Sequence, residues 1–199
     1  MKTLKIIAEL AQGYEGKLSQ ALQLIKSAKQ GLADYAKIQI VFADELATRD
    51  YKDYKIFKSL EMSKNEWLKV SKFSKKLKIH LITEVFGKKS IEIANYIKSK
   101  NFKLHPTDIN NFELINLIKK SKPKKIFVGI GGATKKEINL CLDNLKNFEV
   151  ILLHGHQTSP TPNNDLNISR IKKILEDFKI NKLKKLSLGI ADHVVPGDK

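Results

Sequence analysis

FEVILLHGHQTSPTPNNDLNISRI, residues Phe148–Ile171, contains an apolar run and the polar loop that follows it. The apolar run is Val150–Leu153, and the loop holds glycine, a Pro-Thr-Pro turn and Asn and Asp residues that can cap a helix. A short apolar run that ends in turn residues and precedes a helical pattern predicts a buried parallel strand leading into a βα loop. In α/β proteins the chemistry lies at the carboxyl ends of such strands, so the polar residues of this loop are candidates for function.

The same pattern recurs along the chain. Seven segments read as strands: Leu4–Leu10, Tyr35–Val41, Ile79–Val85, Phe102–His105, Lys125–Ile130, Val150–Leu153, and a run from Leu186 that ends at Asp192 and His193. Apolar residues at helical spacing lie between most of them, and Ser63 with Glu66 and Thr134 with Glu137 form capping boxes. The helix after the sixth strand is predicted to run from about Leu166 to Phe178. The polar segment Phe42–Met62 is long for a βα connection, and loops of that length usually have a task.

The strand–helix alternation predicts a parallel sheet, because no two strands are close enough in sequence for a hairpin. Seven βα units come within one of a (β/α)8 TIM-type barrel, so we expect a single barrel domain over residues 1–199 that is incomplete at its C-terminus. An open doubly wound sheet is the alternative. It would normally carry a glycine-rich turn after the first strand, and Ala11–Gly16 does not match that fingerprint.

Composition limits the class of protein. The chain has 199 residues, 42% hydrophobic and 29% charged, no apolar run long enough to span a membrane, and no signal-peptide pattern. Its single cysteine, Cys141, excludes an internal disulfide and is expected to fill the core, consistent with a reducing cytoplasm. The formal net charge is +16, yet only Arg49 and Arg170 are arginines and the lysines are spread over nearly every helix. We therefore expect no specific nucleic-acid binding, because arginine is the usual reader of bases and phosphates.

Several charged residues stand where a solvated side chain is hard to explain. Lys37 lies inside a strand, and parallel strands are covered on both faces, so a barrel interior with an anion nearby would explain it. Lys103 follows the same logic. His154 continues an apolar run and is expected to point into the core or the barrel. Glu84, at the end of a strand, reads either as a further acid or as an exposed loop residue.

The motifs at the strand ends resemble those of the N-acetylneuraminate (sialic acid) synthase family and its pseudaminic and legionaminic acid relatives. The resemblance covers nearly the whole chain. The matching segments are Ala8-Glu9 with Gly16, Lys37-Ile38-Gln39, Lys103 with Asp108, Asn110 and Asn111, Gly131 with its capping box, Leu153-His154 with Pro160-Thr161-Pro162, and Gly189 with Asp192-His193. Each motif is weak alone, but six in the same order at successive strand ends form a fairly specific signal.

The resemblance implies a barrel enzyme that condenses phosphoenolpyruvate with an N-acetylated amino sugar and releases phosphate, using Mn²⁺ or Mg²⁺. It implies Glu9 and Asp108 as catalytic acids and His193 as a metal ligand. The substrate-binding residues that it implies are Lys37, Gln39, Lys103, His154, His156, Gln157 and Asp192. Such an enzyme needs fixed cations for an anionic substrate and a Lewis acid for the sugar aldehyde. The resemblance implies small-molecule partners and allows a homodimer.

The chain departs from the family pattern at several positions. Pro106, Gly129 and Ala191 stand where the family has serine, Gln157 where asparagine is common, and Ser159 where tyrosine is common. Within residues 1–199 we expect no counterpart of the region that holds the family's second metal-binding histidine, or of its C-terminal antifreeze-like domain. The alternative function is therefore a catalytically impaired relative that acts as a sugar- or phosphate-binding or scaffold module, and a third is a basic surface-binding protein. We expect Lys37→Glu to abolish phosphoenolpyruvate binding and to leave the protein folded.

Overall fold

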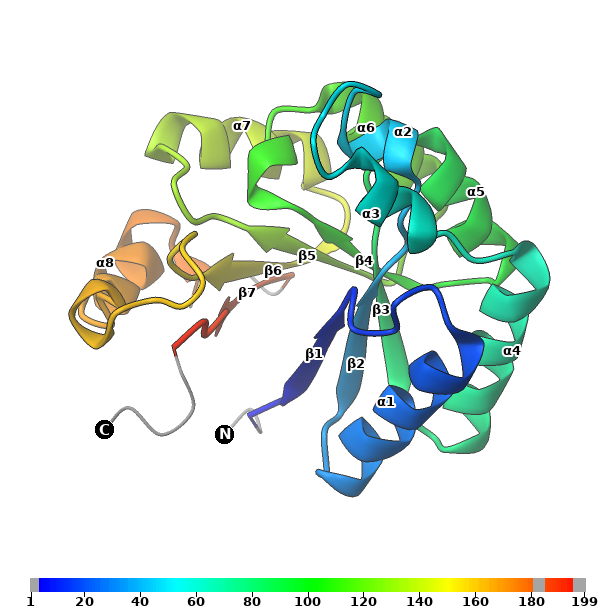
Figure 1. Cartoon of the computed structure of the whole chain (residues 1–199). Coiled ribbons are helices and arrows are strands. Elements are labelled where there is room, and N and C mark those ends of the chain that lie inside the picture. The colour runs from blue at the N-terminus through cyan, green and yellow to red at the C-terminus, as the bar shows by residue number, and fades with distance from the viewer. Residues whose placement is uncertain (1–3, 181–184, 195–199) are drawn as a thin grey trace. The chain divides into compact units, whose positions relative to one another are not determined.

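The computed structural model describes residues 4–180 and 185–194 (Figure 1). The strands of the sheet stand in chain order, as the alternation of elements predicts. They are β1 (Ile7–Ala11), β2 (Tyr35–Gln39), β3 (His80–Glu84), β4 (Asn101–Leu104), β5 (Lys125–Gly129), β6 (Glu149–His154) and β7 (Leu186–Ile190). The pairs β1–β2, β2–β3, β5–β6 and β6–β7 are all parallel.

Helices follow the strands. They are α1 (Leu18–Gln30), α2 (Ala43–Leu46), α3 (Tyr54–Ser59), α4 (Lys64–Lys76), α5 (Lys88–Tyr96), α6 (Phe112–Lys120), α7 (Lys135–Leu145) and α8 (Arg170–Asp177), with 3₁₀ turns η1 (Pro106–Asp108) and η2 (Asn163–Asp165). Both predicted capping boxes form, at the N-termini of α4 and α7. Of the helices in the described part of the chain, none combines the length and apolar character of a membrane span.

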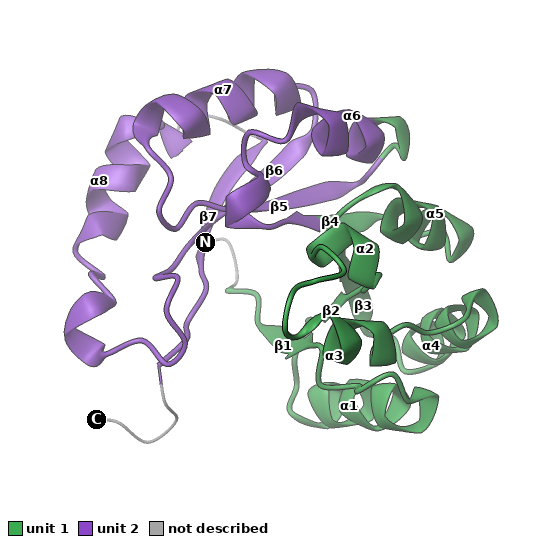
Figure 2. Ribbon diagram, turned by 45° about the horizontal axis from the view of Figure 1, so that its top comes forward, with its two compact units in different colours: residues 1–102, 120–122 green, residues 103–119, 123–199 purple. Residues whose placement is uncertain are grey.

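The chain divides into two compact units (Figure 2). Unit 1 holds the residues up to 102 together with 120–122, and unit 2 holds 103–119 and the residues from 123 onward. In unit 1, α1, α4 and α5 lie on one side of β1–β3, and in unit 2, α6, α7 and α8 lie along one side of β5–β7. The division falls within β4, and the prediction of a single domain stays a prediction.

Unit 1 has a well-defined aromatic core. Trp67 of α4 and Tyr14 of the β1–α1 loop are almost fully buried and meet edge to face, with ring centroids 5.4 Å apart. Such a contact adds about 0.5–1.5 kcal/mol beyond the area that it buries. Trp67 is therefore a packing residue of unit 1.

Several predicted boundaries are wrong, among them the end of the last strand, which is Ile190 rather than His193, and two of them have a clear local cause. The first strand begins at Ile7 rather than Leu4, since Leu4 and Ile6 are exposed and lie outside the core. The helix α8 begins at Arg170 rather than near Leu166, because the chain first makes the 3₁₀ turn η2 and then places Asn167 in the left-handed region, at φ 45°. A left-handed residue interrupts a right-handed helix.

The long polar segment 42–62 was expected to be a loop, but it folds into α2 and α3. Its acidic residues connect α2 to α5. The Glu45 carboxylate accepts hydrogen bonds from the backbone N–H groups of Lys89 and Ser90, at the start of α5. A carboxylate in that place satisfies unpaired helix donors and complements the helix dipole. Asp44 accepts from the Tyr54 hydroxyl and from Lys89, and these bonds lower its pKa to about 2. The task of this segment is at least partly structural.

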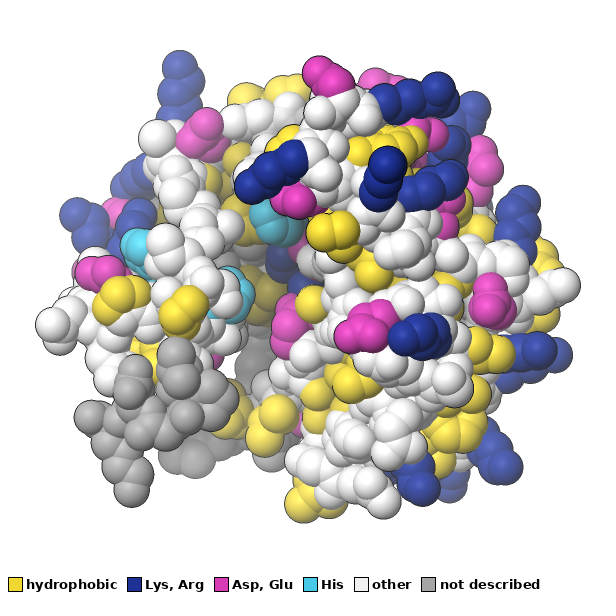
Figure 3. All heavy atoms as spheres, in the orientation of Figure 1, with side chains coloured by type: hydrophobic (Ala, Val, Ile, Leu, Met, Phe, Trp, Pro, Cys, Tyr) yellow, Lys and Arg dark blue, Asp and Glu magenta, His cyan; other side chains and the backbone are white. Residues whose placement is uncertain are grey.

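The basic side chains do not gather in one patch on the face seen in Figure 3. Lys and Arg are scattered over the helices and interspersed with Asp and Glu. Cys141 lies buried in α7, and burial raises its pKa to about 12, so it is a core residue as predicted.

Candidate active site

Within unit 1, the structure brings Glu9, Lys37 and Gln39 together and adds Glu84. The Lys37 ammonium lies 2.6 Å from the Glu9 carboxylate and 2.5 Å from that of Glu84. Glu84 Oε2 also accepts a hydrogen bond from the Gln39 amide at 3.0 Å. The strand register explains the grouping, because Glu9 pairs with Lys37 across β1–β2, and Gln39 with Glu84 across β2–β3. Residues in register on neighbouring parallel strands point to the same face.

This cluster is buried and its charges are largely paired. Lys37 is 7% exposed and Glu84 fully buried, whereas about half of the Glu9 side chain is accessible. Burial alone lowers the pKa of Lys37, but the charges of Glu84 and Glu9 and their hydrogen bonds outweigh it and raise that pKa above its usual value. Lys37 is therefore a charged ammonium held by two carboxylates, and the three groups carry a formal charge of −1.

The structure excludes one of the two predictions for Glu84, which were a further acid and an exposed loop residue. Glu84 is the last residue of β3 and has no exposed surface, so the exposed-loop alternative is wrong. The signal was available in the sequence, because Lys37 needs a buried partner and Glu84 ends the next predicted strand. The sequence alone does not show which charged residues are in contact. The pairing of Lys37 with Glu84 became clear only from the register of β2 against β3.

In unit 2, Lys103 lies in β4 and is 6% exposed, as its place inside a strand predicts. Asp108 follows in η1, where its carboxylate accepts a hydrogen bond from the Asn111 side chain at 3.0 Å. Asn111 in turn accepts from the backbone N–H of Leu114 and so caps α6. Asp108 is thus held at the carboxyl end of β4 by the residue that begins the next helix.

The loops after β6 and β7 lie against each other. The His193 imidazole donates from Nδ1 to the backbone oxygen of His156 at 2.8 Å, and the Ala191 N–H donates to the backbone oxygen of His154 at 2.7 Å. Gln157 packs directly over Gly131, where an added Cβ would lie 2.2 Å from the Gln157 side-chain nitrogen. Unit 2 therefore gathers three of the predicted residues, His156, Gln157 and His193, at adjoining loops.

The remaining side chains there make local contacts. His156 Nδ1 lies 2.7 Å from the Thr158 hydroxyl, and Asp192 accepts from the backbone N–H of Val194 at 2.9 Å. Both side chains are exposed. His154 differs from them, because it is buried at the end of β6 and lines a cavity beneath α8.

The hydrogen bond of His193 bears on the expected metal. A carbonyl oxygen can only accept, so Nδ1 carries the proton and Nε2 of the neutral ring keeps its lone pair. This is the arrangement that metal-binding histidines usually show. Across residues 4–180 and 185–194, however, no group of three or more His, Cys, Asp or Glu side chains is placed to hold a metal ion. His193 fits one ligand of a metal, and the described residues do not complete the site.

Two departures from the family pattern are physically linked. A Cβ added to Gly129 at the end of β5 would lie 2.4 Å from Cγ and 2.6 Å from Cδ of Pro106. The Pro106 ring therefore occupies the space that a side chain at residue 129 would need. A similar relation joins Gly155 and Ala191, since a Cβ on Gly155 would lie 2.4 Å from the Ala191 backbone oxygen.

We expect Gly129→Ser to lower the free energy of unfolding by about 1–3 kcal/mol, because the new side chain overpacks against Pro106. Pro106→Ser should remove the collision, so the double variant should lose less than the sum of the two single changes. Urea unfolding followed by circular dichroism measures all three variants. Gly31→Ser is the control, since its Cβ would meet its nearest neighbour at an ordinary 3.4 Å. Additive losses in the double variant would show that the two positions are independent.

A parallel α/β sheet with buried lysines and strand-end Glu, Asp and His residues is typical of the class of α/β proteins that carry functional groups at the carboxyl ends of their strands. The chain belongs to the NeuB family, whose model matches residues 24–197.

Two curated relatives from Campylobacter jejuni are similar to it. One is an N,N′-diacetyllegionaminic acid synthase, 26% identical over 97% of this chain and 61% of its own length. The other is a pseudaminic acid synthase, 28% identical over 96% of this chain and 59% of its own. A solved structure of the N-acetylneuraminic acid synthetase of Leptospira borgpetersenii is also similar, with 25% sequence identity and a TM-score of 0.87. The match covers 97% of this chain and 66% of that one. The chain thus spans about three-fifths of the length of the curated relatives.

Proposed function

We propose that this chain carries part of the active site of a nonulosonic acid synthase. The reaction condenses phosphoenolpyruvate with an N-acetylated amino sugar and releases phosphate. Membership of the NeuB family over residues 24–197 is the observation that carries the proposal. The similar Campylobacter jejuni proteins are named as synthases of such acids. The proposal includes a TIM-type (β/α)8 barrel, to which residues 1–199 contribute seven strands as one partial domain.

The proposed roles follow from where the residues lie. Lys37 and Lys103 bind the anionic groups of phosphoenolpyruvate, because an ammonium held in a buried strand is a fixed cation. Glu9 is half-exposed beside Lys37 and suits contact with a sugar hydroxyl or transfer of a proton. Asp108, held by Asn111, takes the second acidic role.

Gln39, His156, Gln157 and Asp192 complete the proposed substrate-binding set. The exposed side chains of His156, Gln157 and Asp192 on the loops after β6 and β7 are free to meet a substrate. His154 belongs to the same proposed set, although it is buried at the end of β6 and less accessible than the other members. The metal, when bound, would polarise the sugar aldehyde, and Nε2 of His193 would supply one of its ligands.

The charges around Lys37 favour a second candidate function. Because Glu9 and Glu84 already pair with the ammonium, an incoming dianion has to compete with two carboxylates for Lys37. The serine hydroxyls of the family pattern are also absent at Pro106, Gly129 and Ala191. A relative that has lost catalysis and serves as a sugar- or phosphate-binding module would show these features.

Titration calorimetry with phosphoenolpyruvate, in the presence of Mn²⁺, tests the proposal. We expect measurable binding that Lys103→Gln weakens at least about tenfold, the usual scale of one lost charge-assisted hydrogen bond. Lys100→Gln, an exposed neighbour with the same charge change, is the matched control. An assay of phosphate release with a panel of N-acetylated amino sugars separates the two candidates. Binding without release favours the impaired relative, and absence of binding contradicts both phosphoenolpyruvate roles.

A further inference from the structure

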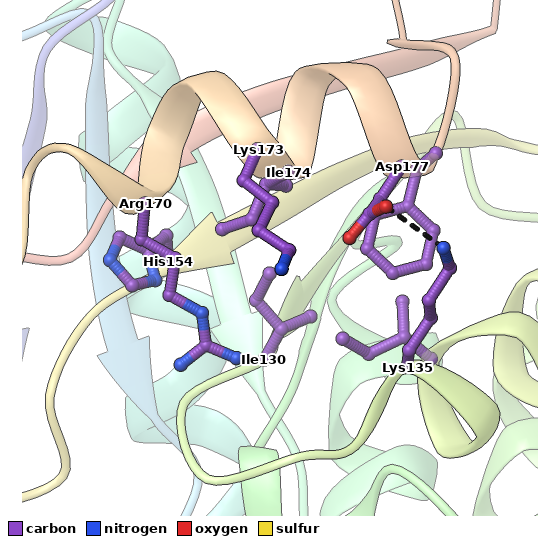
Figure 4. Close-up of a pocket in the computed structure, with 9 residues that line it drawn as sticks. Ile130, Lys135, His154, Arg170, Lys173, Ile174 and Asp177 are labelled. Atoms are coloured by element: carbon purple, nitrogen blue, oxygen red, sulfur yellow. Dashed lines mark hydrogen bonds and ion pairs between the residues drawn. The ribbon is translucent and has the colours of Figure 1, made fainter.

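A separate cavity lies within unit 2, between α7, α8 and the ends of β5 and β6. Its volume is about 250 Å³, and it is lined by apolar residues, including Ile130 and Ile174, and by a group of charged and polar side chains. Figure 4 shows Arg170 and Lys173 reaching down from α8 toward Ile130, with the His154 ring beside Arg170. This volume lies below the range of about 300–1,000 Å³ that is usual for drug-sized ligands, so the space suits a small ligand.

The lining of this cavity is cationic. Lys135, Arg170 and Lys173 contribute three positive charges and Asp177 one negative charge, a formal balance of +2. Asp177 is paired with Lys135 at 2.8 Å, as the dashed line in Figure 4 marks, and that bond lowers the pKa of Asp177. In the described part of the chain neither Arg170 nor Lys173 has a carboxylate within ion-pair distance. Arg170 and Lys173 therefore stand beside the cavity without a direct ion pair to a described carboxylate, although the charge of Lys173 also acts on Asp177.

His154 supplies an independent observation. It is 6% exposed, and its Nε2 atom is buried without a hydrogen-bond partner among the described residues. Buried polar atoms nearly always have a partner, so an unpaired one at a cavity wall marks a place where a ligand or water binds. Burial, followed by the charge of Arg170, lowers the pKa of His154, whereas hydrogen bonds of the ring to the backbone of Asn167 and Leu166 act to raise it. The lowered pKa favours the neutral imidazole, which can donate an N–H without adding charge.

We propose that this cavity is a binding site for a small phosphate-type oxyanion, held by the Arg170 guanidinium, the Lys173 ammonium and the His154 imidazole. Guanidinium groups bind phosphate in a bidentate geometry, and lysine adds a point charge. The apolar wall formed by Ile130 and Ile174 strengthens these interactions by excluding water. The site lies under α8, and it does not depend on the proposed synthase activity.

The site adjoins the loops of the candidate active site. His154 and Arg170 also line a second cavity of about 160 Å³, together with Gly131, His156 and Gln157. An oxyanion bound by Arg170 would therefore lie next to loops that carry proposed substrate-binding residues. Occupancy of the α8 site would hold the start of α8 against β6.

Titration of the full chain with inorganic phosphate tests the site, with binding followed by calorimetry and by the imidazole NMR signals. We expect Arg170→Gln to weaken phosphate binding about tenfold or more and Lys173→Gln to weaken it severalfold. Lys172→Gln is the matched control, because its neighbouring side chain carries the same charge but does not line the cavity. We also expect phosphate to shift the signal that His154→Phe removes from the spectrum.

Two results would overturn this inference. Equal phosphate affinity in Arg170→Gln and Lys172→Gln would show only the general attraction of a chain with net charge +16. An unshifted His154 signal at saturating phosphate would place the ion elsewhere. If Arg170→Gln fails to fold by circular dichroism, the comparison of Lys173→Gln with Lys172→Gln decides. Lys103→Gln should retain phosphate binding under α8 even where it loses phosphoenolpyruvate, so the two proposals fail separately.

Discussion

We expect Lys37→Met to lower the free energy of unfolding by about 3–5 kcal/mol, the usual cost of removing one partner of a buried ion pair. The variant leaves Glu84, which is fully buried, without the ammonium that lies 2.5 Å away in the parent chain. Urea unfolding followed by circular dichroism measures the change. Lys125→Met is the matched control. Lys125 also pairs with a glutamate, Glu149, across neighbouring strands, but both members of that pair are partly exposed. The Lys125→Met change should therefore lower the free energy of unfolding by no more than about 1 kcal/mol.

The pH dependence of that loss has a definite sign. In the parent chain the raised pKa of Lys37 contributes stability that is present below its unfolded pKa and is lost only in strong alkali. The gap between parent and variant should therefore be the same at acidic and neutral pH and should narrow only in strong alkali.

The double variant Lys37→Met/Glu84→Gln should recover much of the loss, because it removes the buried carboxylate together with the ammonium that pairs with it. A single variant as stable as the parent at pH 8 would mean that the buried pairing does not form in solution. The same contacts change one expectation drawn from the sequence. Lys37→Glu would bring three carboxylates together, so we now expect it to disturb folding as well as phosphoenolpyruvate binding.

The second large effect concerns the substrate. We expect Glu84→Gln to strengthen phosphoenolpyruvate binding about tenfold, or about 1.4 kcal/mol, because the change removes a negative charge beside the cation that binds the dianion. The glutamine still offers an oxygen to Lys37, so the ammonium stays in place. Calorimetric titration measures the affinity. Glu84→Asp, which keeps the charge, and Glu92→Gln, an exposed carboxylate on α5, are the controls.

The opposite result would be equally informative. If Glu84→Gln weakens phosphoenolpyruvate binding, then Glu84 serves to position Lys37, and the ion pair belongs to the working site. If affinity is the same in Glu84→Gln and Glu92→Gln, the dianion does not approach Lys37, and the proposed role of that lysine is lost.

Much of this fold follows from local patterns. The apolar runs and capping boxes predicted seven parallel strands in chain order, since strand burial and helix capping are decided by residues near in sequence. The errors lie at element ends. The late start of α8 depends on the left-handed Asn167, and the folding of 42–62 depends on Glu45 meeting the start of α5, a contact over more than forty residues.

The candidate site was predictable as a set of residue types and less so as a set of partners. Lys37 and Lys103 were identified because a buried cation inside a strand demands an explanation, and both are buried. The sequence did not show that two carboxylates already hold Lys37, or that Pro106 fills the space over Gly129. It also gave no sign that His154 and Arg170 line one cavity, because that depends on how α8 packs on β6.

The position of Trp67 has a practical consequence for unfolding experiments. It is the only tryptophan in the chain and lies in the core of unit 1, against Tyr14. Its emission reports the melting of that unit alone, whereas far-ultraviolet ellipticity averages over helices of both. Denaturation curves recorded by the two signals should superimpose if the chain unfolds cooperatively and separate if one unit melts first.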